Sequence, residues 1–475
     1  MSSRKYSFKI VITALFLFAF PAGASAETLE FSGSLSSSFG VFLFRCDPDC
    51  LYTDYENRNI FELALDADLG TSVAARAGVS LHNSNRPSVA RAEDSAQIEN
   101  LQDLSIRITD AWVMGYDLGV DGLDVRIGAQ SVLWGTGDGF SPTNRLNPYD
   151  LSDPVHFDRR LATPAVLASY HISSFTVSGT WFPFFVPSLL SRRVIQGLLN
   201  ADAADDIDLD TNLSGNTLEI DQVRTRVVLP DQTLSQSAFA LRAAWAAPIA
   251  DFAVGYYYGR DHLPQLSGEV IPENFFSGQT TDLIVNLRYP RLQMIAAEMR
   301  APLFGSWTGW IDAALIIPSA TRIFITRSRL QDLERLGAID EAPDEDISAV
   351  IQTGQPYPNF LIGADTSIGT RVYLNFQYLH GFLFERNAAG LHHYGLIGLR
   401  APAIEAPFEF ELRGGVEANR PFDAFGFLTQ LRFTYRHADM LELSALGTVQ
   451  TGHGGTTLGL FTGLSEVRLT ASAHF

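Results

Sequence analysis

The chain is poor in lysine, in cysteine and, beyond its first 21 residues, in long apolar runs. Two cysteines are too few for a disulfide-dense secreted scaffold. The missing apolar runs exclude a transmembrane helix after residue 21, because such a helix needs about 20 consecutive apolar residues. The 475 residues instead contain a basic and apolar N-terminus, an acidic body and many short alternating segments.

The N-terminus has the three parts of a secretory signal peptide. Basic residues in the first nine positions are followed by an apolar run over 10–20 and by small residues at 24–26. The alternative is a membrane anchor, for which the apolar run is too short. We therefore expect a signal peptide over 1–26 and a single exported domain over 27–475.

The body of the chain is strongly acidic. Three of the 34 basic residues lie in the predicted signal peptide, so 31 remain against 53 acidic residues and the mature net charge is −22. An exported protein of this charge repels nucleic acid, and we expect no nucleic-acid partner. Both lysines, Lys5 and Lys9, lie in the predicted signal peptide, so every permanently charged cation of the mature chain is an arginine. This usage reflects either codon bias or a pore wall, where a guanidinium stays charged and pairs with acids.

The two cysteines lie close together in the segment RCDPDC. Cys46 and Cys50 are separated by a proline and two aspartates in a polar segment. In an exported protein this spacing predicts a local disulfide at a loop tip. A metal site or a free thiol pair is the alternative, but no histidine nearby completes a ligand set.

Many segments of about ten residues alternate apolar and polar side chains, as strands with two different faces do. In 467–475 Val, Leu, Ala, Ala and Phe alternate with Arg, Thr, Ser and His. Similar alternation runs through 408–417, 425–436 and 282–289. It suits a closed transmembrane sheet with apolar side chains toward lipid and polar ones toward the lumen. A soluble β-sandwich is the alternative.

The C-terminus gives a more specific indication. The chain ends in Phe475, and a terminal aromatic residue resembles the signal by which the insertion machinery of Gram-negative bacteria recognises outer-membrane barrels. We therefore expect an all-β, antiparallel transmembrane barrel in the outer membrane. Its partners would be outer-membrane lipids, lipopolysaccharide and the barrel-insertion machinery.

Connection lengths predict the number of strands. Short links alternate with long ones, as periplasmic turns alternate with outer loops, if 281–300 is one strand bent at Pro290. This gives 18 strands with both termini periplasmic, and 16 is the alternative. Apolar periodicity predicts short helices within two long loops, over 186–204 and 327–338. They either cap the mouth of the barrel or form solvated flaps.

One long loop, 134–154, stands out by its composition of Gly, Pro, Asn and Asp, which favour turns over strand or helix. Loops of this length usually carry binding or gating function. We predict that it folds into the lumen, with Trp134 anchoring its hinge. The residues predicted to line the constriction are Asp138, Asn144, Arg145, Asn147 and Asp150. The alternative is a rigid turn packed on the rim without solute contact.

The segment 126–154 resembles the signature of a group of poorly characterised large Gram-negative outer-membrane barrels. Their pattern is Gly-x-Gln-x-x-x-Trp-Gly, then an Asp, a Pro and Leu-Asn-Pro-x-Asp. The matching residues are Gly128, Gln130, Trp134, Gly135, Asp138, Pro142, Leu146, Asn147, Pro148 and Asp150. The resemblance implies a porin-like barrel. Because family members are in part associated with envelope lipid export, it also raises a lipid or hydrophobic cargo.

The strand pattern predicts charged side chains along the lumen wall. Those in our prediction are Arg126, Arg288, Arg413, Arg432, Glu409 and Glu411. A barrel of 18 strands is too wide to be filled by its own side chains, so we expect a channel for small solutes or hydrophobic compounds, with weak cation preference. A lipid-export conduit and a surface anchor or receptor without a pore remain the alternatives. The sequence does not determine the oligomeric state.

No motif predicts an enzyme, a metal site or a cofactor. The acidic run 206–217 resembles a calcium loop, but Thr211 and Thr217 occupy the positions that need Gly and Glu. The string GTGDG lacks the Lys-Ser/Thr ending of a phosphate loop. The histidines are scattered, although His380 and the pair His392-His393 could approach each other across neighbouring strands.

Overall fold

The computed structural model of the chain describes most of its residues. The described ranges are 28–43, 55–88, 102–153, 158–190, 219–273, 280–335, 339, 341–369, 371–402, 407–419, 422–437, 440–460 and 465–475. The predicted signal peptide and the pair Cys46 and Cys50 lie outside these residues.

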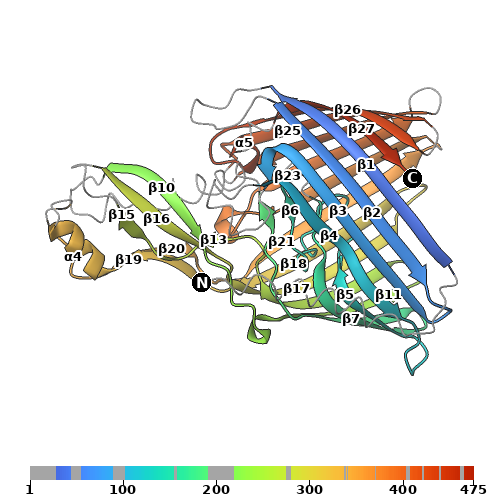
Figure 1. The fold of residues 1–475 in the computed structure, drawn as a ribbon, viewed down its shortest axis with the longest axis horizontal. Coiled ribbons are helices and arrows are strands. Elements are labelled where there is room, and N and C mark those ends of the chain that lie inside the picture. The colour runs from blue at the N-terminus through green and yellow to red at the C-terminus, as the bar shows by residue number, and fades with distance from the viewer. Residues whose placement is uncertain are drawn as a thin grey trace.

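Eighteen antiparallel strands form one sheet that closes on itself, because β1 pairs with both β2 and β27 (Figure 1). The strands are β1 (Thr28–Phe42), β2 (Tyr55–Asp68), β3 (Val73–Ser88), β4 (Gln102–Gly115), β5 (Leu123–Gln130), β7 (Thr163–Ile172), β8 (Phe175–Phe182), β11 (Ala238–Ala246), β12 (Asp251–Arg260), β17 (Arg291–Pro302), β18 (Thr308–Pro318), β21 (Tyr357–Ile368), β22 (Val372–His380), β23 (His393–Pro402), β24 (Phe408–Ala418), β25 (Phe425–His437), β26 (Leu441–Gly452) and β27 (Glu466–His474). They follow one another around the barrel in chain order, which confirms the predicted fold and strand number.

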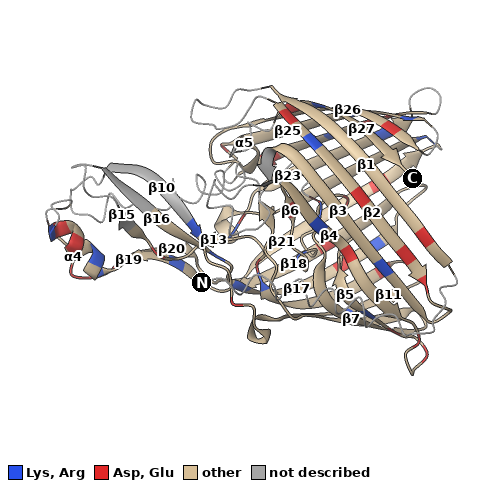
Figure 2. Ribbon diagram, viewed as in Figure 1, with Lys and Arg blue, Asp and Glu red and all other residues tan. Residues whose placement is uncertain are grey.

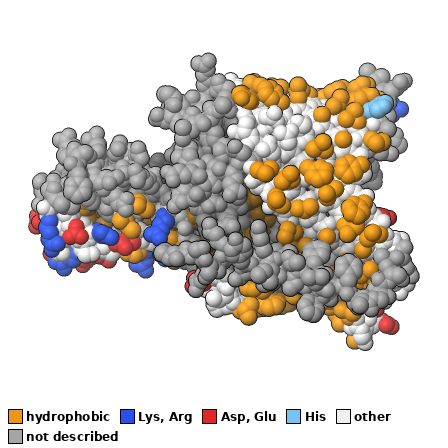
Figure 3. All heavy atoms as spheres, in the orientation of Figure 1, with side chains coloured by type: hydrophobic (Ala, Val, Ile, Leu, Met, Phe, Trp, Pro, Cys, Tyr) orange, Lys and Arg blue, Asp and Glu red, His pale blue; other side chains and the backbone are white. Residues whose placement is uncertain are grey.

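The two faces of the barrel strands differ as the alternation predicts. In β27, Val467 and Leu469 are 46% and 58% exposed, whereas Glu466 and Arg468, which alternate with them, are buried. Apolar side chains accordingly cover much of the outer surface of the barrel (Figure 3). A closed sheet with an apolar exterior satisfies its backbone groups in lipid, and the protein is an outer-membrane barrel.

Within the described ranges, no helix is long and apolar enough to cross a membrane.

Two small sheets and a helix project beyond the end of the barrel that carries the long connections, at the left in Figure 1. One sheet contains β10 (Glu219–Val227), β13 (Gln265–Leu266), β15 (Ile271–Glu273) and β16 (Thr280–Arg288), and the other contains β14 (Gly268–Glu269), β19 (Thr321–Ile325) and β20 (Ile347–Gln352). Helix α4 (Arg327–Arg335) buries Leu330 and Leu333 against them. Its charged residues are visible in Figure 2.

This projection corrects one prediction and supports another. The segment 281–300 is not one strand: β16 belongs to the outer sheet and β17 to the barrel, with Pro290 between them. Arg288 therefore lies outside the barrel sheet and does not line the lumen wall. The helix predicted over 327–338 forms over Arg327–Arg335. Of the helix predicted over 186–204, Leu189 and Leu190 form the short strand β9, and residues 191–204 lie outside the described ranges.

Candidate functional site

The chain between β5 and β7 runs across the lumen of the barrel, as predicted for 134–154. It forms hydrogen bonds to β18 near its start and ion pairs to β2 near its end. Counting around the barrel from β1, β2 is second and β18 is eleventh, so they are nine strands apart in a ring of 18. These strands face each other across the lumen, and we call residues 134–153 the lumen loop.

The first anchor of the lumen loop is a pair of buried carboxylates on the barrel wall. Asp312 of β18 accepts the backbone N–H of Thr136 at 2.8 Å, its hydroxyl at 2.8 Å and the N–H of Gly137 at 2.9 Å. Glu298 of β17 accepts the N–H of Gly135 at 2.9 Å. Hydrogen bonds to an ionised acceptor are stronger than neutral ones, so this wall holds the start of the loop firmly.

The hinge residue Trp134 packs where the wall has no side chain. Its indole ring is buried and lies against Gly255 of β12, where an added Cβ would come within 2.5 Å of the ring. Gly137 is fitted in the same way, because a Cβ there would lie 2.5 Å from the side chain of Leu361. Two glycines, one on the wall and one in the loop, thus permit the close contact.

Asp138 is the predicted constriction residue whose side chain remains exposed within the barrel. Its backbone N–H donates to Gln377 of β22 at 3.2 Å, and its carbonyl accepts from the same side chain at 3.0 Å. The backbone of Asp138 is therefore held near the wall while its carboxylate remains exposed.

Asn147 has a different role from the one predicted, because it is fully buried. Its Oδ1 accepts the N–H of Val132 at 2.7 Å, and its Nδ2 donates to the carbonyls of Gln130 and Leu161 at 3.1 Å each and to the hydroxyl of Thr163 at 2.9 Å. The amide fastens the two ends of the loop base together. It does not line an aperture.

Of two further predicted constriction residues, Arg145 is buried and Asn144 is partly exposed. Arg145 is 5% exposed, and the backbone carbonyl of its neighbour Asn144 accepts the hydroxyl of Tyr149 at 3.3 Å. The ring of Tyr149 in turn lies 3.8 Å below the guanidinium of Arg160. Tyr149 thereby links the backbone of the lumen loop to Arg160.

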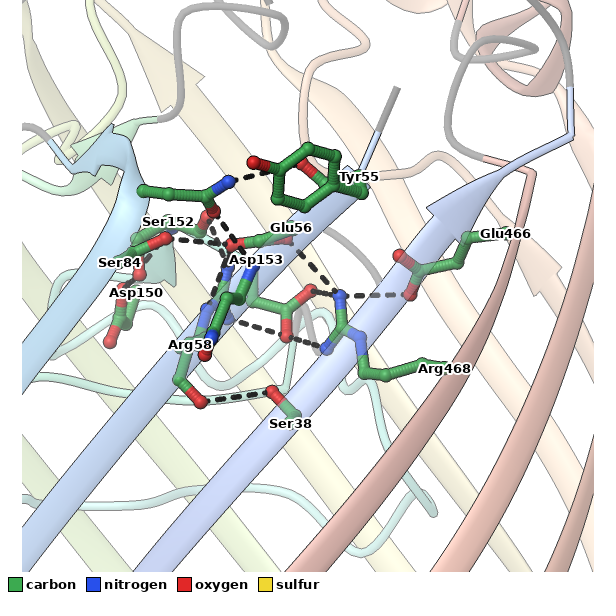
Figure 4. Close-up of polar contacts among 12 residues, drawn as sticks. Ser38, Tyr55, Glu56, Arg58, Ser84, Asp150, Ser152, Asp153, Glu466 and Arg468 are labelled. Carbon is green, nitrogen blue, oxygen red and sulfur yellow. Dashed lines mark hydrogen bonds and ion pairs between the residues drawn. The ribbon is translucent and has the colours of Figure 1, made fainter. Parts of the chain in front are cut away.

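The second anchor is an ion-pair cluster at the opposite wall (Figure 4). Asp153, near the end of the lumen loop, pairs with Arg58 of β2 at 2.7 Å and with Arg468 of β27 at 2.6 Å. Each arginine has a second acid on its own strand, Glu56 for Arg58 at 2.7 Å and Glu466 for Arg468 at 2.8 Å. All five side chains are nearly buried, so the pairs are weakly screened by solvent.

Gly40 of β1 makes room for this cluster. It pairs with Glu56 on one side and with Arg468 on the other, and an added Cβ would lie 3.2 Å from the carboxylate of Glu466. A third contact ties the loop to β4, where Asp150 pairs with Arg107 at 2.7 Å. Asp150 is therefore a buried anchor, which differs from the predicted exposed position in the constriction.

Between its anchors the lumen loop packs on an apolar part of the lumen wall. Trp134 and Leu146 share a buried cluster with inward-facing residues of β11, β12, β17, β18 and β21. Those wall residues are Ala240, Tyr257, Met294, Ala296, Ala314, Ile316 and Tyr357. Phe140, Tyr149 and Leu151 join a second cluster with wall residues of β18, β21, β22 and β23. The loop and this wall are packed as a protein interior is.

The charged wall residues lie elsewhere in the barrel. Glu411 of β24 is approached by Arg413 at 2.8 Å, Arg432 at 3.7 Å and Arg400 at 3.8 Å, and the arginines are between 35% and 51% exposed. Glu409 pairs with Arg436 at 3.4 Å. Together these groups form a solvated, mixed-charge surface. Arg126 of β5 donates to Gln130 and lies over the ring of Trp112.

The terminal Phe475 lies at the seam between β27 and β1 that closes the barrel. It exchanges two backbone hydrogen bonds with Gly33 of β1, at 2.8 and 3.0 Å, and its ring stacks on Phe61. Its role as an insertion signal stays a prediction.

Sequence reasoning missed Glu298, Gln377, Asp153, Arg58 and Arg468. Glu298 could have been found from the sequence pattern. It pairs with Asp312, which the alternation of 310–318 places on the inward face of the barrel. The ion-pair cluster had none, since Arg468 and Asp153 are 315 residues apart.

Comparison with known proteins identifies the family to which the chain belongs. The model of a family described as "Protein of unknown function (DUF1302)" matches residues 71–308. Comparison with curated proteins gave no match. The chain is similar to OccK3 (OpdO) of Pseudomonas aeruginosa (10% identity, 97% of this chain and 99% of that chain, TM-score 0.50) and to OccAB4 of Acinetobacter baumannii (9%, 95% and 99%, 0.50). It is also similar to the outer membrane protein OpdK of Pseudomonas aeruginosa (10%, 95% and 100%, 0.47). At these identities the likeness concerns the fold, whereas the family match extends over half of the chain, so the protein belongs to the DUF1302 family.

Proposed function

We propose that the protein is an outer-membrane channel in which the lumen loop controls the passage of small solutes. The observation that carries the proposal is the fastening of one loop to β18 and to β2, on opposite sides of the lumen. A barrel of 18 strands encloses more space than its own side chains fill. A loop across that space is the natural constriction.

The solute path would run beside the lumen loop, along the polar part of the wall. Asp138 on the loop and the mixed charges around Glu411 on β24 are accessible charged groups that such a solute would meet. Rings of charge in a pore set selectivity. From the mature charge of −22, which counts 31 basic against 53 acidic residues, we expect weak cation preference.

Removing the loop's first anchor tests the proposal. Asp312→Asn keeps the shape of the side chain but weakens several hydrogen bonds to the loop, so conductance in planar bilayers should rise or fluctuate more. The matched control is Glu442→Gln, a lumen-facing carboxylate on β26 that pairs with Arg436 at 3.0 Å. It should behave as the wild type does. Unchanged conductance in D312N would show that the lumen loop does not control the solute pathway.

A hydrophobic compound is the second candidate cargo. One observation favours it: β5 pairs with β4 only over Ala111–Gly115, and among the described residues no strand pairs with the outer half of β4 on that side. Beside that unpaired edge, Ile106 is 73% exposed on the outer surface. An unpaired edge next to an apolar surface suits the lateral exchange of an amphiphile with the membrane.

Two measurements separate the candidates. A solute channel conducts ions in planar bilayers. A conduit for hydrophobic compounds would show little conductance, but it would transfer a fluorescent amphiphile between vesicles, and Ile106→Lys would slow that transfer. Leu81→Lys is the matched control, because Leu81 pairs with Ile106 one strand farther from the edge. If the protein shows neither ion conductance nor transfer of the amphiphile, a surface anchor or receptor is favoured.

A further inference from the structure

Two carboxylates and a histidine meet at the outer mouth of the barrel, apart from the lumen loop. Glu385 and His392 come from the connection between β22 and β23, and Glu417 lies at the outer end of β24. One ligand atom from each lies within 4.8 Å of the others. His392 Nδ1 is 2.7 Å from Glu417 Oε1 and 3.4 Å from Glu385 Oε1.

We propose that Glu385, His392 and Glu417 bind one divalent transition-metal cation, with Zn²⁺ as the best fit. Zinc is commonly held by imidazole nitrogen together with carboxylate oxygen, with a fourth position left for water. Ca²⁺ and Mg²⁺ prefer sites made of oxygen ligands alone. No sequence motif indicates this site, because Glu385 and Glu417 lie 7 and 25 residues from His392.

The distances are close to those of a zinc site. Ligand atoms at about 2.1 Å from a tetrahedral zinc ion lie about 3.4 Å from one another. Glu385 and His392 already have this separation, at 3.4 Å. His392 and Glu417, now joined by a hydrogen bond of 2.7 Å, would have to move apart by about 0.7 Å. A small movement of the partly exposed imidazole would provide it.

The charges also favour a cation with more than one positive charge. Glu385 and Glu417 are both buried, and His392 is the basic side chain that pairs with both of them. Buried carboxylates are usually paired or coordinate a metal ion, and one divalent cation would neutralise both of them.

The two carboxylates are already held in position. Two backbone N–H groups of the β22–β23 connection donate to Glu385 Oε2 at 2.9 Å each. The N–H groups of Thr457 and Leu458, in the short helix α5 (Thr457–Leu460), each donate to Glu417 at 2.7 Å. Ordered ligands of this kind are typical of metal sites. A bound ion would join the β22–β23 connection, the end of β24 and α5 at the mouth of the barrel.

The experiment loads the detergent-solubilised protein with zinc after removal of metals by chelation. We expect about one tightly held zinc ion per chain by elemental analysis, and a higher thermal midpoint with zinc than without. His392→Gln keeps an N–H donor toward Glu417 but lacks the ligand nitrogen, so zinc affinity should fall by about 100-fold. His393→Gln, the adjacent histidine, should change it by less than about two-fold.

Three outcomes would overturn the proposal. They are no zinc retained at about one per chain, equal retention in H392Q and wild type, or loss of zinc in H393Q alone. The last result would place zinc at the neighbouring His380–His393 pair, whose rings lie 4.8 Å apart. If H392Q does not fold, Glu385→Gln provides the second variant and should lose zinc in the same way.

Discussion

Replacing Asp153 by asparagine should release the far end of the lumen loop. The Asp153 carboxylate is 3% exposed and pairs with Arg58 at 2.7 Å and Arg468 at 2.6 Å (Figure 4). Asparagine keeps the size of the side chain and removes its charge. Both ion pairs that fasten this end of the loop to β2 and β27 are then lost.

The expected cost follows from the composition of the cluster. Removing one partner of a buried ion pair costs about 3–5 kcal/mol when the other is left unpaired. Here Glu56 still pairs with Arg58 at 2.7 Å and Glu466 still pairs with Arg468 at 2.8 Å. We therefore expect a cost at the lower end of this range. About 3 kcal/mol raises the undocked fraction of the loop by roughly 100-fold. The strand ladder of the barrel is untouched, so the thermal midpoint of the barrel should change little.

Single-channel recording in planar bilayers measures this effect. D153N should show more frequent and longer periods of high conductance than the wild type. Asp66→Asn is the matched control, because Asp66 pairs with Arg76 in the lumen at 3.2 Å, with both side chains 39% exposed. Such an exposed pair contributes about 0–1 kcal/mol. If D153N and D66N give the same recordings, the loop is not held by this cluster.

Four further predictions concern single positions. Gly255→Val should push away the indole ring that packs on it and shift tryptophan emission to the red, because even a Cβ would lie 2.5 Å from that ring. Asn147→Ala removes four buried hydrogen bonds and should destabilise the loop base by about 2–4 kcal/mol, seen as faster limited proteolysis of the loop. Burial lowers the pKa of His262, whose Nδ1 and Nε2 lie 2.8 and 3.1 Å from the carbonyl oxygens of Val186 and Leu146. Loop anchoring should therefore be complete above about pH 6.5 and weaken below it, and His262→Gln should make conductance less dependent on pH. Cys46 and Cys50 should form a disulfide, so the unreduced peptide should be two hydrogens lighter, and full alkylation without reductant would contradict this.

The sequence was sufficient for the barrel because the relevant information is local. Alternation with period two assigns each side chain of 467–475 to lipid or lumen from its parity alone. Alternating short and long connections then fix the strand number. The exception was 281–300, where Pro290 marks a departure from the barrel: β16 has the same alternation as a barrel strand but buries its apolar face in the outer sheets.

The sequence by itself therefore determined the closed sheet and the presence of an unusual loop over 134–154, since composition and periodicity act between near neighbours in the chain. Only the tertiary structure decided what that loop does with its polar residues. Asn147 and Asp150 turned out to be buried anchors, because their partners come from other strands and offer hydrogen bonds that solvent would otherwise supply. Likewise Asp153 meets Arg468 across 315 residues, a contact that exists only once β27 has paired with β1 and closed the ring.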